Sequence, residues 1–371
     1  MLAITILCMT ATFVVQLLLH YKIINLRRYF MRVVYFFANT LPAYLQGKDS
    51  DRAAEITKKR SKAGIPSFRD FPNYAISSKK IGECQCRIYT PKKKTNDLLF
   101  VYLHGGGFCF LSAAFYDNLM KNFVDELNCT IVSIDYPLAP EHVFPTAIEE
   151  AYNTIETLMG SLSEIIGFET TNCMIGGDSS GGCLTAVITQ KAASCKKDWF
   201  KNQILIYPAV GSFNFNSQSY KDHLTTEIRS VQSPRGYANC TMLYLGIKTT
   251  DQNREELMRC EEYIPTNLRI DSPFRPFINN VLVSPILAKD DLLKKLPSSI
   301  TFLAIADILQ DEGFAYHMKM KKAGKGNKDI SHQFEWIKNS THGEVSMNLE
   351  AARDVVKEVK YWLDKRGYLE Y

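Results

Sequence analysis

A serine flanked by glycines is the feature of the 371-residue sequence that most directly indicates chemistry. The segment reads Gly177-Asp178-Ser179-Ser180-Gly181-Gly182, directly after the apolar run 173–176 and directly before a stretch compatible with a helix. At a sharp turn from strand to helix, glycines leave room where Cβ atoms would collide, and the serine hydroxyl is exposed. The helix dipole would favour negative charge developing beside it. The pattern therefore predicts Ser179 as a nucleophile in acyl transfer.

A second glycine-rich segment, His104-Gly105-Gly106-Gly107, follows the apolar run 98–103. Where side chains are absent, backbone N–H groups can approach a substrate closely, and a developing oxyanion needs donors about 2.7–3.1 Å away. We therefore expect an oxyanion hole at His104, Gly105, Gly106 and Gly107, with the N–H of Ser180 as a further donor. A phosphate-binding loop is the weaker alternative, because the sequence contains neither Gly-Lys-Ser/Thr nor Gly-x-Gly-x-x-Gly.

A serine nucleophile needs a base. Three of the seven histidines follow the acid candidates closely enough to serve: His317, His332 and His342. His317 falls within a predicted helix, and His332 opens a predicted strand. His342 lies in the predicted loop after the last strand, where a mobile base can reach the serine. We therefore predict His342 as the base.

The base needs an acid to orient it, and in this arrangement the acid comes between the serine and the histidine. Asp307 directly follows the predicted strand 300–306, so it would emerge at the same sheet edge as Ser179. The alternative for Asp307 is a helix N-cap. Asp311 and Glu312 come a helical turn later, and we expect them to cap the next helix.

The elements that must position these residues follow a regular alternation. From residue 84 onward, short apolar runs alternate with helical stretches, which predicts an α/β fold with a mostly parallel central sheet flanked by helices. Strands are expected at 84–89, 98–103, 130–134, 173–176, 203–207, 300–306 and 333–337. Helices are expected near 115–127, 145–160, 181–193, 313–323 and 346–365. Residues 212–283 break the alternation, and so long an insertion predicts a lid over the site.

Composition excludes several classes of protein. With 46% hydrophobic and 22% charged residues the chain is neither disordered nor fibrous, and a net charge of +5 is too small to argue for nucleic acid. The charge is uneven, because residues 20–94 hold 17 Lys and Arg against 5 Asp and Glu, whereas residues 95–371 hold 27 against 34. The ten cysteines show no metal-ligand spacing, so we expect no metal.

The N-terminal segment 1–19 has no charged side chain. A helix of that length rises about 28 Å, close to the roughly 30 Å of a hydrocarbon core. We favour an uncleaved membrane anchor over a cleaved signal peptide, because no basic segment precedes it and no small-residue cleavage site follows. Residues 20–80 form a basic neck. Within it, 22–46 predicts an amphipathic helix that either lies at a membrane surface or packs on the body as part of the lid.

Two signals disagree about the side of the membrane. Basic residues follow the apolar segment and none precedes it, so the positive-inside rule would keep the body in the cytosol. Asn-x-Thr sequons at Asn128, Asn239 and Asn339 are glycosylation candidates that matter only in a lumenal or secreted chain. The residues alone leave the side open.

Several motifs together resemble a known family. In chain order they are 104–107, 135–142 (Asp-Tyr-Pro-Leu-Ala-Pro-Glu-His), 177–182, 307–313 and 342–343. This set resembles the hormone-sensitive-lipase branch of the α/β-hydrolases, over roughly residues 84–365. Within that branch, the N-terminal span and the overall length of the chain most resemble those of the arylacetamide deacetylases.

The resemblance implies an α/β-hydrolase fold over 81–371, with a helical lid from the neck and the 212–283 insertion. It implies a carboxylesterase or deacetylase acting on small lipophilic esters or acetylated compounds without a cofactor, with Ser179 as nucleophile, His342 as base and Asp307 as its partner. It also implies an N-terminal anchor in the endoplasmic reticulum membrane and a lumenal catalytic domain; the alternative is secretion after cleavage.

The sequence departs from the family pattern in three places. Pro137 stands where relatives usually carry arginine. Glu344 stands where an aromatic residue is usual, and its carboxylate would raise the pKa of His342 if the two approach closely. Ala304 stands where several relatives have a cysteine able to pair with one at the position of Cys109, so we expect Cys109 to be free. A non-catalytic binder, like the plant gibberellin receptors that resemble this family, is the alternative function, and the intact His342 argues against it.

Overall fold

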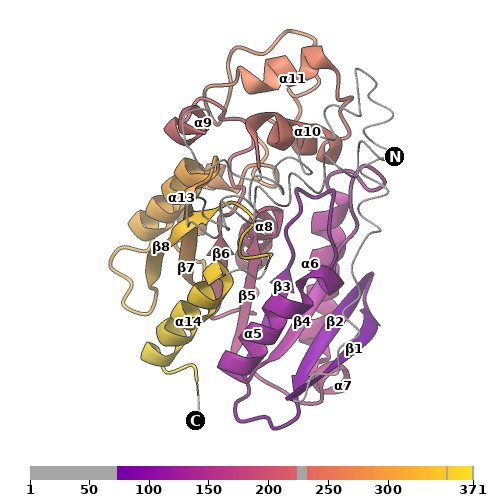
Figure 1. The fold of residues 1–371 in the computed structure, drawn as a ribbon, viewed down its shortest axis with the longest axis vertical. Coiled ribbons are helices and arrows are strands. Elements are labelled where there is room, and N and C mark those ends of the chain that lie inside the picture. Colours follow the sequence, from indigo (N-terminus) through magenta and orange to yellow (C-terminus); the bar gives the residue numbers. More distant parts are fainter. Residues whose placement is uncertain (1–72, 224–231, 348–349, 370–371) are drawn as a thin grey trace, which may run out of the picture.

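The computed structural model describes residues 73–223, 232–347 and 350–369 (Figure 1). The predicted anchor, the amphipathic segment and most of the basic neck fall outside these ranges. Within the described ranges, no helix is both long and apolar enough to cross a bilayer. The same residues hold no group of three or more His, Cys, Asp or Glu side chains that could bind a metal ion.

The described residues form one sheet of eight strands, in the order β1-β2-β4-β3-β5-β6-β7-β8. Pairing is antiparallel from β1 through β2 to β4 and parallel from β4 across to β8. The bounds are β1 (Tyr74–Ile81), β2 (Cys84–Pro91), β3 (Leu99–Leu103), β4 (Thr130–Asp135), β5 (Cys173–Asp178), β6 (Asn202–Ile206), β7 (Ser298–Ala306) and β8 (His332–Thr341). The predicted mostly parallel sheet is confirmed, and all seven predicted strands are found.

Strand β1 was not predicted, and it overlaps the end of the expected neck. Its first and last residues, Tyr74 and Ile81, are buried, whereas Lys79 and Lys80 are exposed. An edge strand with so little burial lacks the alternation of apolar and polar residues that marks a strand in sequence. The sheet therefore begins before the boundary at residue 81.

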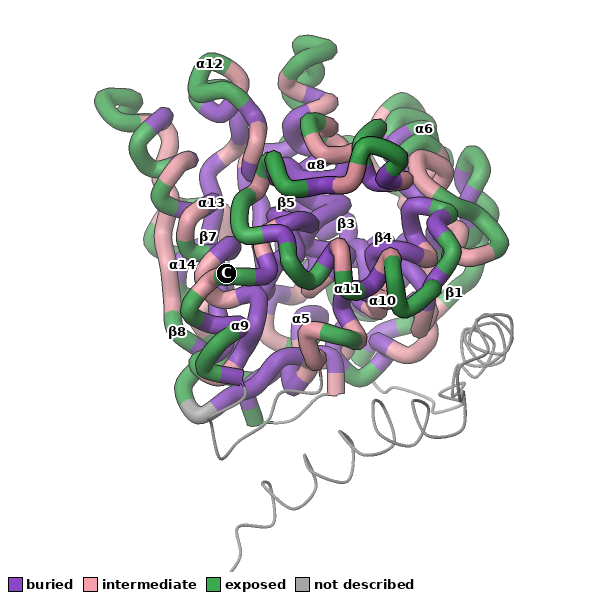
Figure 2. Tube along the Cα trace, turned by 90° about the horizontal axis from the view of Figure 1, so that it is seen from above, coloured by how far each residue is buried: buried purple, intermediate pink, exposed green. Residues whose placement is uncertain are grey.

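Helices cover both faces of the sheet (Figures 1 and 2). Because side chains alternate along a strand, Leu99 and Val101 pack with α6 and α8, whereas Phe100 and Tyr102 pack with α5 and α14 on the other face. The helices outside the insertion are α5 (Asp117–Leu127), α6 (Thr146–Gly160), α7 (Leu162–Ile166), α8 (Ser180–Ser194), α12 (Asp290–Leu293), α13 (Gln310–Ala323) and α14 (Glu350–Lys365), with 3-10 helices η2 (Ala113–Tyr116) and η3 (Pro285–Leu287). The predicted helices are present, but α13 begins earlier and α14 later than expected.

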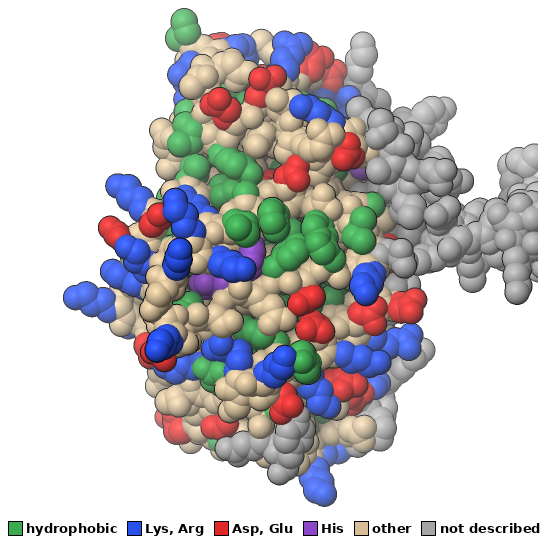
Figure 3. Space-filling view, turned by 90° about the vertical axis from the view of Figure 1, so that its left-hand side faces the viewer, with side chains coloured by type: hydrophobic (Ala, Val, Ile, Leu, Met, Phe, Trp, Pro, Cys, Tyr) green, Lys and Arg blue, Asp and Glu red, His purple; other side chains and the backbone are tan. Residues whose placement is uncertain are grey.

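Strand β8 forms one edge of the sheet, beside α13. Figure 3 shows this side of the molecule, where apolar side chains gather near the middle of the face and charged side chains of both signs lie around them. The exposed apolar residues of β7, α13 and β8 are Ile305, Phe314, Met318 and Trp336.

The insertion 212–283 lies over the carboxyl ends of the strands (Figure 1). We call it the cap. Its described parts contain the helices α9 (Gln218–Asp222), α10 (Pro234–Tyr244) and α11 (Asp251–Met258), and no strand. The side chains of Ser233 and Thr250 accept hydrogen bonds from backbone N–H groups in the first turns of α10 and α11. The position of the cap is that expected of a lid, and its action as one stays a prediction.

Candidate active site

Ser179 lies at the turn between β5 and α8, in a strained backbone conformation. Its φ is 55° and its ψ is −119°, a region that residues with side chains rarely adopt. A Cβ on Gly181 would lie 2.0 Å from the carbonyl oxygen of Leu103, and one on Gly177 would lie 2.4 Å from the carbonyl oxygen of Gly181. The glycines are therefore required by close backbone contacts, as the motif predicted.

A chain of hydrogen bonds joins the three predicted triad residues. The Nε2 of His342 is 2.9 Å from the Oγ of Ser179, and its Nδ1 is 2.7 Å from the Oδ2 of Asp307. The other oxygen of Asp307 accepts a hydrogen bond from the N–H of Leu309 at 3.0 Å. Asp307 and His342 are buried and Ser179 is partly exposed, so the hydroxyl faces the side from which a substrate can approach.

The alternative role for Asp307 is that of a helix N-cap, which the start of α13 tests. Helix α13 begins at Gln310 with Leu309 as its N-cap, so Asp307 is not the cap residue. His342 follows β8 directly, because this strand continues to Thr341 rather than ending at 337. His342 therefore lies directly after the last strand, at the carboxyl end of an edge strand.

The other two candidate histidines lie at the opposite end of the sheet. His317 is in the middle of α13, and His332 opens β8, where its Nδ1 is 2.7 Å from the Oγ of Ser299. Burial lowers the pKa of each to about 4. Both are therefore neutral at pH 7. Because they lie at the other end of the sheet from Ser179, neither can replace His342 as its base.

The loop after β3 carries the glycines of the predicted oxyanion hole. Gly106 and Gly107 have φ of 121° and 60°, which favours glycine, and a turn is closed by N–H groups of Cys109 and Phe110 that donate to the carbonyl of Gly106. Among the hydrogen bonds between described residues, the N–H groups of Gly106 and Gly107 donate to none. Ser180 opens α8, so its N–H is one of the first four of a helix, which have no partner within the helix.

Gly105 was predicted to be part of the oxyanion hole, but its N–H is bonded within the protein. Its N–H donates to the hydroxyl of Tyr116 at 3.0 Å and to the Oδ1 of Asp178 at 2.9 Å. This N–H is therefore already bonded inside the protein and cannot also bind an oxyanion. His104 is fully buried, and its carbonyl accepts a hydrogen bond from the hydroxyl of Tyr136 at 2.6 Å. Gly105 and His104 thus anchor the loop.

Asp178 is the residue of this site that sequence reasoning missed. Its carboxylate accepts hydrogen bonds from the hydroxyls of Tyr102 and Tyr116, each at 2.9 Å, in addition to the N–H of Gly105. It is 2% exposed, and burial raises the pKa of its carboxyl. The sequence signal that could have identified Asp178 is its position next to Ser179 inside the glycine-rich motif 177–182. Asp178 therefore connects residues 104–107, which we call the oxyanion loop after their predicted role, to the turn that carries Ser179.

Asp311 and Glu312 do not cap α13 as expected. The Oδ2 of Asp311 accepts a hydrogen bond from the N–H of Ser219 at 2.9 Å, and the Oε1 of Glu312 accepts one from the N–H of Gly211 at 3.0 Å. The hydroxyl of Ser219 also donates to the carbonyl of Ile308 at 2.7 Å. These three bonds connect the segment that follows Asp307 to the chain entering the cap. The side chain of a helix N-cap bonds to the first turn of its own helix, whereas these side chains bond to a different segment.

Two of the departures from the family pattern concern Glu344 and the partner of Cys109. The carboxylate of Glu344 accepts hydrogen bonds from the N–H of Thr341 at 2.9 Å and from its hydroxyl at 3.1 Å. The expected effect of Glu344 on the pKa of His342 stays a prediction. Cys109 is free in the structure, as are the other described cysteines.

The three glycosylation candidates lie on different elements of the fold. Asn128 follows α5, and its side-chain amide donates to the carbonyl of Lys93 at 3.1 Å. Asn239 lies on α10, where its Oδ1 accepts a hydrogen bond from the Nε of Arg254 at 2.6 Å. Asn339 lies in β8. Their modification stays a prediction.

Comparison with known proteins gives the family. A family model described as the alpha/beta hydrolase fold matches residues 100–336, more than half of the chain. The chain belongs to this family. It is similar to arylacetamide deacetylase of Oryctolagus cuniculus, with 27% identity over 343 residues, 81% of this chain and 83% of that protein. It is also similar to neutral cholesterol ester hydrolase 1 of Rattus norvegicus, with 25% identity over 298 residues, 70% of this chain and 72% of that one.

Two solved structures of esterases have the same fold as this chain. A hyperthermophilic esterase from Pyrobaculum calidifontis superposes with a TM-score of 0.65 at 24% identity, covering 91% of this chain and 98% of that one. An esterase from Pseudomonas putida gives a TM-score of 0.63 at 21% identity over 91% and 97%. The predicted α/β-hydrolase fold and the predicted resemblance to the arylacetamide deacetylases are both confirmed.

Proposed function

We propose that this α/β-hydrolase is a serine carboxylesterase or deacetylase that hydrolyses lipophilic esters or acetyl groups. The observation that carries the proposal is the hydrogen-bonded series from Asp307 through His342 to Ser179, at a strained turn beside a glycine loop. The similarity to arylacetamide deacetylases and to a cholesterol ester hydrolase supports a hydrolase of carboxylic ester bonds.

In the proposed reaction, Ser179 attacks the substrate carbonyl carbon and its proton passes to the Nε2 of His342. Asp307 holds the Nδ1–H of His342 and stabilises the imidazolium that forms. The N–H groups of Gly106, Gly107 and Ser180 bind the oxyanion. His342 then gives its proton to the departing alcohol or amine. A water molecule, deprotonated by the same histidine, releases the acid and restores Ser179.

The cap supports the choice of lipophilic substrates. Phe215, Tyr220 and Tyr237 form an aromatic cluster in its base, with ring centroids 5.1–6.4 Å apart. The three are buried and belong to the same core as Ile308 and Leu309, which follow Asp307. An apolar cap interior of this kind would favour apolar substrate groups that contact it. The cap and the neck would thus select the substrate, and the sheet would carry the chemistry.

The location belongs to the same proposal. We infer an anchor at residues 1–19, a basic neck, and a lumenal catalytic domain at the endoplasmic reticulum membrane, with glycans at Asn128, Asn239 or Asn339. Endoglycosidase treatment of the expressed protein tests this topology. A shift in electrophoretic mobility supports a lumenal body, and an unmodified chain contradicts it.

The decisive test of the reaction compares wild type with Ser179→Ala on p-nitrophenyl acetate and on 4-nitroacetanilide. We expect the variant to lose at least about 10⁴-fold in kcat on the ester, because the nucleophile is gone. Ser194→Ala, at the far end of the same helix, is the matched control and should keep the wild-type rate. If wild type hydrolyses neither compound faster than Ser179→Ala, the protein is a binder rather than an enzyme.

A further inference from the structure

Two cysteines meet where the oxyanion loop touches the cap. Cys109 lies two residues after Gly107 and is fully buried, and Cys240 lies on α10 and is partly exposed. The thiol of Cys109 lies 3.9 Å from the carbonyl oxygen of Cys240. A hydrogen bond with the Cys240 side chain and burial together raise the pKa of the Cys109 thiol well above its usual value. The two thiols are therefore direct neighbours, although 131 positions separate them.

Cys240 also touches the oxyanion loop itself. A Cβ placed on Gly107 would lie 2.8 Å from the Sγ of Cys240 and 3.1 Å from its Cβ. The N–H of Cys109 in turn closes the turn at Gly106 by donating to its carbonyl at 3.1 Å. The pair thus spans the contact between the loop that would bind the oxyanion and the first long helix of the cap.

We propose that Cys109 and Cys240 form a covalent modification site, at which oxidation creates a disulfide that fixes α10 to the oxyanion loop. The proposal concerns a bond between two cysteines and does not depend on ester hydrolysis. It provides a partner for Cys109 within the cap.

The chemistry is an exchange with a small disulfide such as oxidised glutathione. Cys240 reacts first because it is the accessible thiol of the pair, whereas Cys109 is buried and its pKa is raised. Its thiolate attacks one sulfur of the small disulfide and releases one thiol. Cys109 then loses its proton and attacks the sulfur of Cys240, which releases the second thiol. Two protein thiols are oxidised and one small disulfide is reduced, so electrons and protons balance.

The bond would constrain the chain strongly. It closes a loop of about 130 residues, and long loops give the largest stabilisation in the chain-entropy model. For a domain of this size we expect the midpoint of thermal unfolding to rise by about 5 °C or more on oxidation. Reduction with dithiothreitol should reverse the rise.

Peptide mapping tests the bond directly. The full-length protein is incubated with oxidised glutathione, blocked with iodoacetamide, deglycosylated and digested with trypsin without reduction. Trypsin isolates each cysteine in its own peptide, 95–121 for Cys109 and 236–248 for Cys240. We expect these two peptides to appear as one cross-linked species that dithiothreitol separates. Recovery of both peptides with alkylated cysteines, or of either one linked to a different peptide, overturns the proposal.

Variants supply the controls. Cys240→Ser should abolish both the cross-link and the thermal shift, and it keeps the Asn239 sequon intact because serine is allowed at that position. Cys195→Ser removes an exposed thiol at the end of α8 and should behave as wild type. An equal thermal shift in wild type and in Cys240→Ser would contradict the proposal. Because neither readout needs a substrate, an inactive protein would refute the proposed hydrolysis and leave this result interpretable.

Discussion

The floor of the site and the cap above it are built on different principles. The floor comprises the ends of β3, β5, β7 and β8, where glycines allow the backbone to approach itself and a buried carboxylate, Asp178, joins two loops. The cap has short helices connected by irregular chain, and charged side chains hold its segments together. The arrangement of the floor therefore depends on close approach of the backbone, whereas the charged contacts of the cap depend on which side chains meet.

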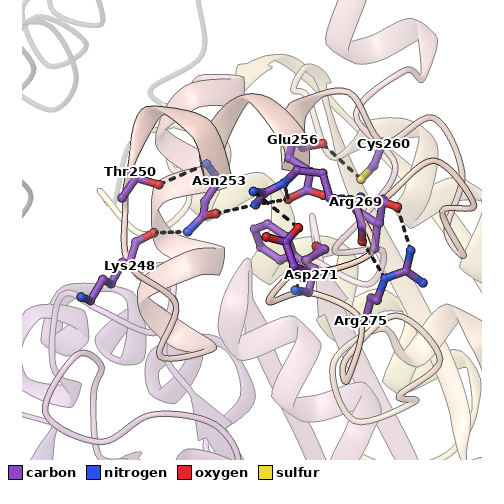
Figure 4. A network of polar contacts seen from close by, with 11 residues as sticks. Lys248, Thr250, Asn253, Glu256, Cys260, Arg269, Asp271 and Arg275 are labelled. Carbon is purple, nitrogen blue, oxygen red and sulfur yellow. Dashed lines mark hydrogen bonds and ion pairs between the residues drawn. The ribbon is translucent and has the colours of Figure 1, made fainter.

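The network around Arg269 shows how the cap is held (Figure 4). Its guanidinium donates to the Oε2 of Glu256 at 2.9 Å and 3.0 Å, and to the Oδ1 of Asn253 at 3.0 Å. Burial alone would raise the pKa of Glu256, but the hydrogen bonds from Arg269 lower it. The carbonyl of Arg269 in turn accepts a hydrogen bond from Arg275 at 2.7 Å. One arginine thus joins α11 to the irregular chain after it.

The largest expected effect comes from replacing His342, the proposed general base in the floor of the site. Replacing His342 with glutamine removes the group that takes the proton of Ser179, so we expect kcat on p-nitrophenyl acetate to fall by at least about 10⁴-fold. Thermal unfolding should show that the variant stays folded. A variant that keeps more than a few per cent of the wild-type rate would remove His342 from the proposed mechanism.

A smaller but substantial loss is expected from Asp178→Asn. An amide has one oxygen to accept with, and it cannot satisfy two tyrosine hydroxyls and the N–H of Gly105 together. The oxyanion loop would lose its alignment, which we expect to lower kcat by about 10²-fold with KM changed far less. Tyr102→Phe removes one of the three bonds and should cost less than Asp178→Asn. A change confined to KM would place the role of Asp178 in substrate binding instead.

The same comparison explains what could be predicted from the sequence. The triad residues and the glycine loop follow strands directly, so local pattern was enough to place them at one sheet edge. Asp178 was missed because its partners Tyr102 and Tyr116 are 76 and 62 positions away, and nothing local indicates that they meet. Local spacing predicts a helix N-cap for Glu312, because its actual partner Gly211, just before the cap, is 101 positions away in the sequence.

The cap was predicted only as a break in the alternation of strands and helices. Its helices are short, and α11 is buried only at Arg254 and Leu257, so it has almost no apolar stripe to mark it. Its contacts depend on which charged side chains meet across irregular chain, and this cannot be read from spacing. The sheet was predictable for the opposite reason, since β3, β4, β5 and β6 are almost fully buried apolar runs.

The end of the sheet opposite the floor should respond to acid first. His317 and His332 have pKa values of about 4 in the folded state against an ordinary 6.5. Between these values the unfolded chain binds more protons, so stability is present above about pH 6.5 and is lost as the pH falls towards 4.

We expect His317→Gln to remove part of this loss, so that wild type loses about 1–3 kcal/mol more than the variant between pH 7 and pH 4.5. Urea unfolding at the two pH values measures the difference. His142→Gln, an exposed histidine with no such burial, is the control and should track wild type. Parallel curves for His317→Gln and wild type would show that this histidine is not buried as a neutral group.

The smallest effects should distinguish buried from exposed charges within the cap itself. Arg254 of α11 has a side chain only 10% exposed, and it donates to the carbonyl of Thr249 at 2.9 Å as well as to Asn239 and Asp251. Arg254→Met keeps the aliphatic stem but leaves the carbonyl of Thr249 and the Oδ1 of Asn239 without this donor, which we expect to cost about 1–2 kcal/mol. Asp251 keeps its ion pair with Arg235.

Arg259, at the end of the same helix, is the exposed arginine with which Arg254 is compared. Its side chain is 76% exposed and pairs with Glu255 at 3.3 Å, so Arg259→Ala should cost less than about 0.5 kcal/mol. Because both residues belong to the cap, we expect kcat on a small ester to stay within about threefold of wild type in either variant. Limited proteolysis should cut the cap of Arg254→Met faster than that of Arg259→Ala. Equal cutting rates would mean that buried side-chain pairs do not hold the cap, and a loss of kcat matching that of Asp178→Asn would mean that cap and floor are not separable.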